Sequence, residues 1–139
     1  GIVVVGAVGN DGPTAGSVKS PGSCAKIITV GCADTTKEKI EIAEFSSRGP
    51  IFDIIKPDIV APGVNITSLS NDKNLFTQMS GTSVSTPFVA GVSALILQQN
   101  PDFTPNQVKS QIMYSADSLP FSPNDCGMGL LNAKSALGY

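Results

Sequence analysis

The first eight residues restrict the fold most strongly, because Gly1-Ile2-Val3-Val4-Val5-Gly6-Ala7-Val8 is a continuous apolar run rich in β-branched side chains. Runs of this kind are typical of strands covered on both faces, as in the parallel sheets of α/β proteins. We therefore predict a central strand with neighbours on both sides. The 139 residues offer few other strands of that type, so we expect the chain to be the later part of a longer domain.

The following segments continue an α/β pattern. A second buried strand is predicted at 26–32 and a short one at 59–61, where flanking prolines limit the ladder. Residues 65–69 and 74–79 predict a hairpin, with its turn at 71–73. Apolar residues then recur at helical spacing over 83–99, which predicts a helix buried almost all round.

The C-terminal part is predicted to be mainly helical. Thr104 and Pro105 have the residue types of an N-cap and a first helical position. The helix that follows should be amphipathic, with Val108, Ile112 and Met113 on one face. A turn and strand are expected over 127–132, before a short terminal helix at 133–137.

Composition excludes several classes of partner. The hydrophobic fraction of 41% is ample for the core of one globular domain, while a net charge of −2 with 14% charged residues leaves no basic stripe. Nucleic acid and membranes are therefore not expected as partners. The odd set of Cys24, Cys32 and Cys126 fits neither a disulfide framework nor a zinc site, so we interpret all three as buried free thiols.

The segment from Gly81 to Gly91, GTSVSTPFVAG, contains a serine at the predicted helix start. The free N–H groups and the positive dipole end of that helix would stabilise an oxyanion forming at Ser83. A serine needs an adjacent base for nucleophilic attack, yet the chain contains no histidine. Three interpretations stay open: part of an enzyme, a noncatalytic relative, or Thr82 or Ser83 merely capping the helix.

Four segments together resemble the subtilisin-like serine proteases (the subtilase family, peptidase family S8). Gly81–Gly91 is similar to the family's nucleophile motif, Val4–Gly12 to its oxyanion-asparagine strand, Phe45–Pro50 to its FSSRGP turn, and Pro57–Gly63 to its PDIVAPG strand. The similarity extends to about residue 136. It implies an α/β, three-layer subtilisin-like fold with a mainly parallel sheet flanked by helices, of which 1–139 would be the C-terminal portion of the catalytic domain.

The resemblance gives roles to two residues. Ser83 would be the nucleophile that forms an acyl-enzyme, and the Asn10 side chain would donate to the oxyanion together with the Ser83 backbone N–H. Loss of such a donor costs ~10²–10³ in turnover, a magnitude established on subtilisin itself, a member of this family. Without the resemblance, Asn10 before Asp11-Gly12 would be interpreted as a turn residue.

Substrate contacts are also implied by the resemblance. The Ala7-Val8-Gly9 edge would pair with an extended peptide, and the loop from Ser17 to Gly22 would form the floor of the pocket for the residue before the scissile bond. Thr82 is expected beside the substrate. Lys19 suggests a preference for acidic or polar side chains, although a solvated surface lysine explains it as well.

The chain departs from the family pattern in two ways. Phe88 stands where the family has a non-catalytic histidine, and Val84 and Ser85 replace methionine and alanine, which affects packing more than chemistry. More seriously, the catalytic aspartate and histidine of the family lie upstream of the oxyanion strand. We therefore expect a serine endopeptidase whose isolated 139-residue chain is inactive; the alternative is a noncatalytic subtilase-like binding or regulatory pseudoprotease. The absence of a Gly-x-Ser-x-Gly elbow disfavours other α/β hydrolases.

The expected partners are a peptide or protein substrate, the N-terminal half of the same catalytic domain, and a second copy pairing through an exposed sheet edge. No cofactor is certain and no metal site is assigned, although calcium in the full-length enzyme is left open. A secreted or cell-surface location is expected from the family, and the unpaired cysteines leave an intracellular member open.

Overall fold

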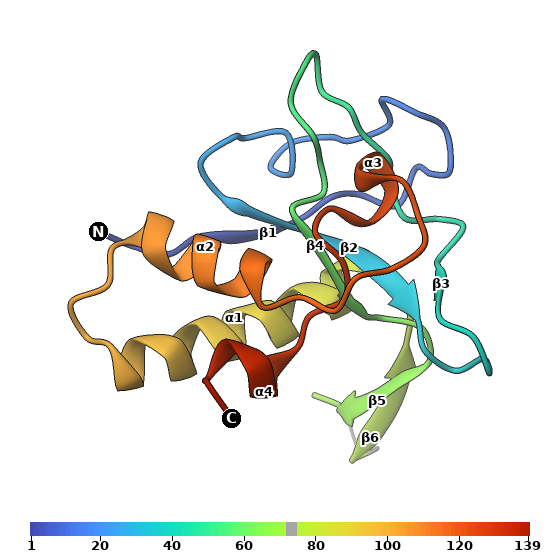
Figure 1. Cartoon of the computed structure of the whole chain (residues 1–139). Coiled ribbons are helices and arrows are strands. Elements are labelled where there is room, and N and C mark those ends of the chain that lie inside the picture. Colours follow the sequence, from blue (N-terminus) through green and yellow to red (C-terminus); the bar gives the residue numbers. More distant parts are fainter. Residues whose placement is uncertain (72–74) are drawn as a thin grey trace.

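The computed structural model describes residues 1–71 and 75–139 and shows a mixed α/β arrangement (Figure 1). The α/β class is therefore confirmed, with small sheets. The strands are β1 (Val5–Ala7), β2 (Ile28–Asp34), β3 (Glu41–Ile42), β4 (Ile59–Pro62), β5 (Ile66–Leu69) and β6 (Phe76–Met79), and the helices are α1 (Thr82–Gln99), α2 (Pro105–Tyr114), α3 (Pro123–Cys126) and α4 (Ala133–Ala136).

Strand β2 organises the main sheet. It pairs in parallel with β1 and with β4, and in antiparallel with β3, and all seven of its residues are buried. Helices α1, α2 and α4 lie together on one side of this sheet, while the β5–β6 hairpin projects from it (Figure 1). The sheet is mixed and small, so these strands do not by themselves establish the mainly parallel, three-layer arrangement.

The alternation of side chains along the strands divides the core into two clusters. Ile28 and Val30 of β2 face α1 together with Ile59 and Ala61 of β4, whereas Val60 points to the opposite face. The larger cluster also includes buried side chains of α1 and α2: Val89, Val92, Ile96, Val108 and Ile112. The α1 side of the sheet is therefore the better-covered one.

The start of α2 confirms the predicted cap. The Thr104 hydroxyl accepts from the Gln107 N–H and the Gln107 side chain accepts from the Thr104 N–H, which forms a capping box with Pro105 at the first helical position. Val108 and Ile112 are buried as expected, and Met113 is half-buried. Local capping chemistry thus fixes where α2 begins, while Val108 and Ile112 pack it against α1.

The prediction for the first eight residues is wrong in extent. Only Val5–Ala7 forms a strand, and Ile2 and Val4 are 84% and 51% exposed. Strand β1 pairs with β2 alone among the described residues. An apolar run predicts that both faces are covered, but the elements needed to cover these residues are not among those the structure describes.

The prediction that the helix at 83–99 is buried all round is also wrong. Helix α1 buries Val89, Val92 and Ile96, but Phe88 is 41% and Leu95 is 45% exposed. Its inner face contacts β1, β2, β4 and α2. No described element covers the opposite face, and apolar periodicity cannot reveal what covers a helix.

Smaller differences concern the remaining segments. Residues 127–132 form no strand, because Leu130 makes only isolated bridges to Val60 and Asp117. Strand β3 and helix α3 were not predicted. The hairpin at 65–79 is confirmed in its described strands. Residues 72 and 73 of the turn predicted at 71–73, and residue 74 of the second predicted strand, lie outside the described residues. None of the helices described here is long and apolar enough to cross a membrane.

Candidate active site

Helix α1 presents Ser83 at its first turn. Its N-cap is Gly81, with no side-chain cap hydrogen bond, so the interpretation of Thr82 or Ser83 as a helix cap is wrong. The Ser83 side chain is exposed, whereas Thr82 is buried. Among the residues that the structure describes, the Ser83 hydroxyl makes no hydrogen bond, so it is free to meet a ligand.

Asn10 is held against the start of the same helix, 72 positions away in sequence. Its Oδ1 accepts from the backbone N–H of Thr82 at 3.0 Å and from the Thr82 hydroxyl at 2.9 Å. Because both bonds occupy the oxygen, the amide group's NH₂ is directed away from Thr82. Thr82 therefore fixes the orientation of the Asn10 side chain.

Three polar atoms lie around one point beside Gly81. A Cβ added at Gly81 would lie 3.3 Å from Ser83 Oγ, 3.7 Å from Asn10 Nδ2 and 3.9 Å from the Ser83 backbone nitrogen. Two of these groups are donors, and the third is the hydroxyl. The arrangement places a side-chain N–H and a backbone N–H at the positive end of an 18-residue helix, which favours a negative oxygen next to the hydroxyl.

Ser47 supports the turn that carries Asn10. Its backbone N–H donates to Gly9 O at 3.0 Å, and its hydroxyl accepts from the Asp11 N–H at 3.0 Å. Gly9 has φ +111° and its absent Cβ would lie 2.8 Å from Ser47 Oγ, so a side chain would not fit there. The sequence motif around Ser47 was recognised, but this positioning role was missed.

Buried groups behind α1 hold the helix start on the sheet. The Ser85 hydroxyl donates to Ala61 O at 3.0 Å, and the Cys32 thiol lies close by, both next to Gly63. Burial raises the pKa of the Cys32 thiol above its ordinary value, so this thiol stays protonated and is not a competing nucleophile. Cys32 and Cys126 are buried free thiols as predicted, but Cys24 is exposed, contrary to the prediction.

The predicted substrate contacts at Ala7, Val8 and Gly22 lie together. A Cβ at Gly22 would be 2.6 Å from Ala7 O and 2.9 Å from Val8 Cα, so the pocket loop packs directly behind the strand. The Lys19 N–H donates to Val8 O at 3.4 Å, while its ammonium pairs with Asp11 at 3.1 Å. This pairing agrees with the simpler interpretation of Lys19 as a surface lysine.

A groove of about 530 Å³ runs from Ser83 along the β5–β6 hairpin. It is lined by Phe88 on the helix side and by Leu69 and Met79 on the hairpin side, all three of them exposed. A ligand at Ser83 would therefore meet an apolar wall. Among the described residues, no group of three or more His, Cys, Asp or Glu side chains could hold a metal ion.

The sequence profile described as the subtilase family, Peptidase_S8, matches residues 1–129. The chain belongs to the subtilase family. Among curated proteins, this subtilase chain is 42% identical to the serine protease AprX of Bacillus subtilis (strain 168), over 99% of the chain and 35% of that protein. It is 39% identical to subtilisin Savinase of Lederbergia lenta, over 98% of the chain and 46% of that protein.

Solved structures give the same result for the fold. The prenylagaramide maturation protease PagA is 29% identical and superposes with a TM-score of 0.81, over 98% of the subtilase chain and 50% of PagA. Fervidolysin from Fervidobacterium pennivorans, a keratinolytic enzyme related to subtilisin, is 26% identical with a TM-score of 0.82. The chain covers 22% of fervidolysin, and thus spans half or less of each of these relatives.

Proposed function

We propose that this subtilase chain supplies the nucleophile and the oxyanion-binding groups of a serine endopeptidase. The observation that carries the proposal is the fixed Asn10 amide, whose Nδ2 lies near the same point beside Gly81 as the Ser83 backbone nitrogen and hydroxyl. The membership of the family supports peptide bonds as the substrate class. The specific peptide sequence would be selected by the pocket that the family resemblance implies between the Ala7-Val8-Gly9 edge and the loop from Ser17 to Gly22.

The reaction would proceed by acyl transfer. Ser83 Oγ attacks the carbonyl carbon of the scissile bond while its proton passes to a base, and the carbonyl oxygen becomes an oxyanion bound by Asn10 Nδ2 and the Ser83 N–H. Collapse of this intermediate expels the amine, which takes the proton, and leaves an ester on Ser83. Water then hydrolyses the ester by the same sequence of steps.

We propose that the base comes from outside these 139 residues, since the family resemblance assigns that role to a histidine and the chain has none. We propose that the aspartate and histidine belong to an N-terminal part of the same catalytic domain. That part would pair along the free edge of β1 and cover the exposed face of α1 at Leu95. It would complete a three-layer fold with a mainly parallel sheet, and the chain alone would be inactive.

Labelling with a fluorophosphonate probe tests the proposal. We expect no labelling and no peptide hydrolysis by the 139-residue chain alone, but labelling of Ser83 in the complete protein that contains it. Ser83→Ala should abolish labelling, and Ser80→Ala is the matched control on the same segment. A complete protein with intact upstream Asp and His that remains unlabelled would instead be a noncatalytic binding or regulatory relative.

Replacement of Asn10 tests the oxyanion role. In the complete enzyme, Asn10→Ala should lower kcat by about 10²–10³ with a small change in KM, because the donor acts mainly on the transition state. Asn106→Ala, on the exposed side of α2, is the control. An unchanged kcat in a folded Asn10→Ala enzyme would refute the assignment.

A further inference from the structure

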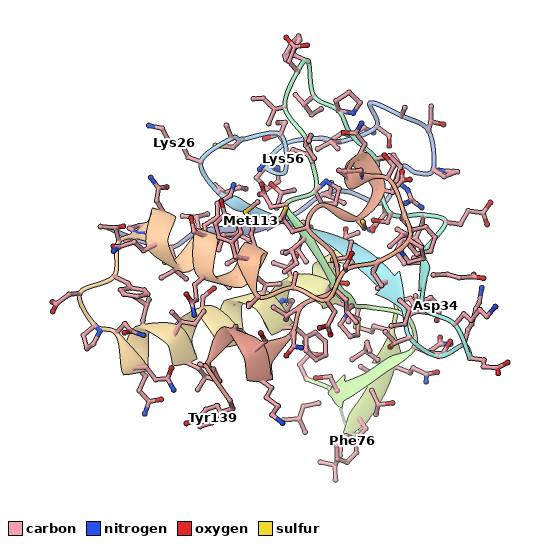
Figure 2. The ribbon with its side chains drawn as sticks, viewed as in Figure 1. Lys26, Asp34, Lys56, Phe76, Met113 and Tyr139 are labelled. Atoms are coloured by element: carbon pink, nitrogen blue, oxygen red, sulfur yellow. The ribbon has the colours of Figure 1, made fainter. Side chains whose placement is uncertain are left out.

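A cluster of ionised side chains is buried behind the pocket loop and takes no part in the proposed chemistry. Lys56 is completely buried, and Figure 2 shows it in the interior, between the loop and the sheet. Its ammonium donates to Asp58 Oδ2 at 2.7 Å and to the Thr29 hydroxyl at 2.8 Å, and it lies 3.4 Å from Ile27 O. The ammonium therefore joins the segment before β4 to the beginning of β2.

A second ammonium reaches the same carboxylate from helix α2. Lys109 Nζ lies 2.9 Å from Asp58 Oδ1 and donates to Ile27 O at 2.8 Å and to Ala25 O at 3.2 Å. Each oxygen of Asp58 thus has its own lysine. Both lysines reach Ile27 O, and Lys109 also reaches Ala25 O, in the segment that joins the pocket loop to β2.

Thr29 connects this cluster, through Gly22, to the Ala7-Val8-Gly9 edge that is expected to pair with the substrate. Its N–H donates to Asp58 Oδ2 at 2.7 Å, and its hydroxyl donates to Gly22 O at 2.8 Å. Because Lys56 donates to the same hydroxyl, the single hydroxyl proton is directed to Gly22. Gly22 packs against Ala7 O and Val8 Cα without room for a Cβ, so the connection ends at the predicted pocket.

Stability alone is a poor explanation for such a cluster. Burying charges has a large desolvation cost, and well-packed apolar residues of similar volume are often as stable or more stable. Here both oxygens of the Asp58 carboxylate are used to fix positions, because Oδ2 accepts from the Thr29 N–H at the beginning of β2 and from Lys56, and Oδ1 pairs with Lys109 of helix α2. A fixed geometry is the property that a substrate pocket requires.

We propose that Lys56, Asp58 and Lys109 are positioning residues that set the wall of the pocket for the residue before the scissile bond, through Thr29 and Gly22. This inference rests on the proposed endopeptidase function. It adds that substrate selection depends on Lys109 of helix α2, which belongs neither to the nucleophile nor to the oxyanion site. Ser83 reactivity, in contrast, depends on Asn10 and Thr82, which the cluster does not contact.

The test compares two reactions of the complete enzyme after Lys109→Met. Fluorophosphonate labelling of Ser83 needs the nucleophile but not the pocket, and should stay within about twofold of the unmodified enzyme. Because a displacement of about 1 Å can cost about 10²-fold, kcat/KM for the best peptide should fall about 10–100-fold, mainly through KM. The kcat/KM values of peptides that differ in the residue before the scissile bond should become more similar to one another. Lys109→Arg should restore part of the lost kcat/KM.

Lys134→Met is the matched control, since Lys134 is an exposed helical lysine on α4. It should leave both reactions unchanged. Equal losses of labelling and of peptide cleavage in Lys109→Met would show a general structural role and overturn the inference. Unchanged peptide selection would overturn it as well.

Hydrogen exchange gives a readout that does not depend on activity. Directly after the pocket loop, the Ser23 N–H donates to Lys19 O and the Cys24 N–H donates to Pro21 O, both acceptors being within the loop. In Lys109→Met these two amides should exchange faster while those of β4 do not, and unchanged loop exchange would refute the anchoring itself. If the unmodified complete protein fails to label, the proposed function fails; the exchange result then still decides separately whether the cluster anchors the loop.

Discussion

Two clusters of three charged residues differ in how far their ammonium groups are exposed to water. In one, two ammoniums surround the carboxylate of Asp58, with Lys56 completely buried and the Asp58 and Lys109 side chains 7% and 17% exposed. In the other, two carboxylates surround the ammonium of Lys37, which pairs with Glu41 and lies 3.8 Å from Asp34. The Lys37 and Glu41 side chains are each 53% exposed, and only the Asp34 side chain, at 12%, is largely covered.

The contrast shows that the number of ion pairs says little about their effect. Water and salt screen the charges around Lys37, and exposed pairs contribute little to stability. Around Asp58 there is little water to solvate a charge that loses its partner. Removal of one member therefore leaves an uncompensated buried charge, which lowers the unfolding free energy strongly. Burial, not composition, therefore decides which cluster the fold depends on.

The largest expected effect is that of Asp58→Asn. This change leaves the Lys56 ammonium buried without a counter-charge, which costs about 3–5 kcal/mol of unfolding free energy. Differential scanning calorimetry should show the unfolding midpoint lowered by about 10 °C or more. The two lysines would also lose the carboxylate oxygens to which they donate.

Glu41→Gln is the matched control, because it also removes one carboxylate from a three-membered cluster. Its midpoint should stay close to that of the unmodified protein. The double change Asp58→Asn with Lys56→Met should recover part of the loss, since the isolated ammonium is gone. Equal midpoints for Asp58→Asn and Glu41→Gln would break the comparison between the two clusters.

A second, smaller effect concerns pH. Burial lowers the pKa of Lys56 below the ordinary lysine value of 10.5, against the opposing influence of Asp58. Between the lowered value and 10.5 the unfolded chain binds more protons than the folded chain, so this lysine makes the unfolding free energy rise with pH. Its contribution has the opposite sign to that of a lysine whose pKa is raised by a partner.

Comparison with Lys56→Met isolates that contribution. Burial raises the pKa values of the Cys32 and Cys126 thiols, and these groups make stability fall at alkaline pH, so the total pH profile mixes both signs. The difference in unfolding free energy, unmodified protein minus Lys56→Met, should increase from pH 7 towards the ordinary lysine value in urea titrations. A difference that decreases over this range would show that the interaction with Asp58 raises the pKa of Lys56 by more than desolvation lowers it.

The sequence allowed the nucleophile region to be predicted because its signals are local or ordered along the chain. The four motifs identified Asn10 and Ser83, and the structure brings these residues together, although their catalytic roles remain predictions. The cap at Thr104 depends on only four residues, and it was confirmed. By contrast, the exposure of Phe88 and Leu95 depends on which elements cover α1, and no periodicity contains that information.

The Asp58 cluster was missed although one signal was present. Two opposite charges, Lys56 and Asp58, stand directly before an apolar strand. Lys and Asp are rarely buried unless they are paired, so their position next to a buried strand indicated an ion pair. The identity of the second partner could not be deduced, because Lys109 lies on α2 and meets Asp58 only after the helix has packed. Long-range polar contacts of this kind follow from the fold and are not visible in its local patterns.

The smallest effect is expected in the cluster around Lys37. There, the neutral Thr36 should lower the pKa of Asp34 more than the charged Lys37 does. The pKa of Asp34 is lowered mainly by hydrogen bonds from Thr36, whose hydroxyl and N–H donate to Asp34 Oδ1 at 2.6 and 3.0 Å, and less by Lys37. The stabilisation is present above the ordinary aspartate value of 3.8 and is lost as the pH falls through the lowered pKa. Thr36→Val should therefore move acid unfolding, followed by circular dichroism, to higher pH, whereas Lys37→Met should leave its midpoint nearly unchanged and insensitive to added salt. A larger shift for Lys37→Met than for Thr36→Val would mean that the exposed ion pairs stabilise the fold after all, which would remove the distinction between the two clusters.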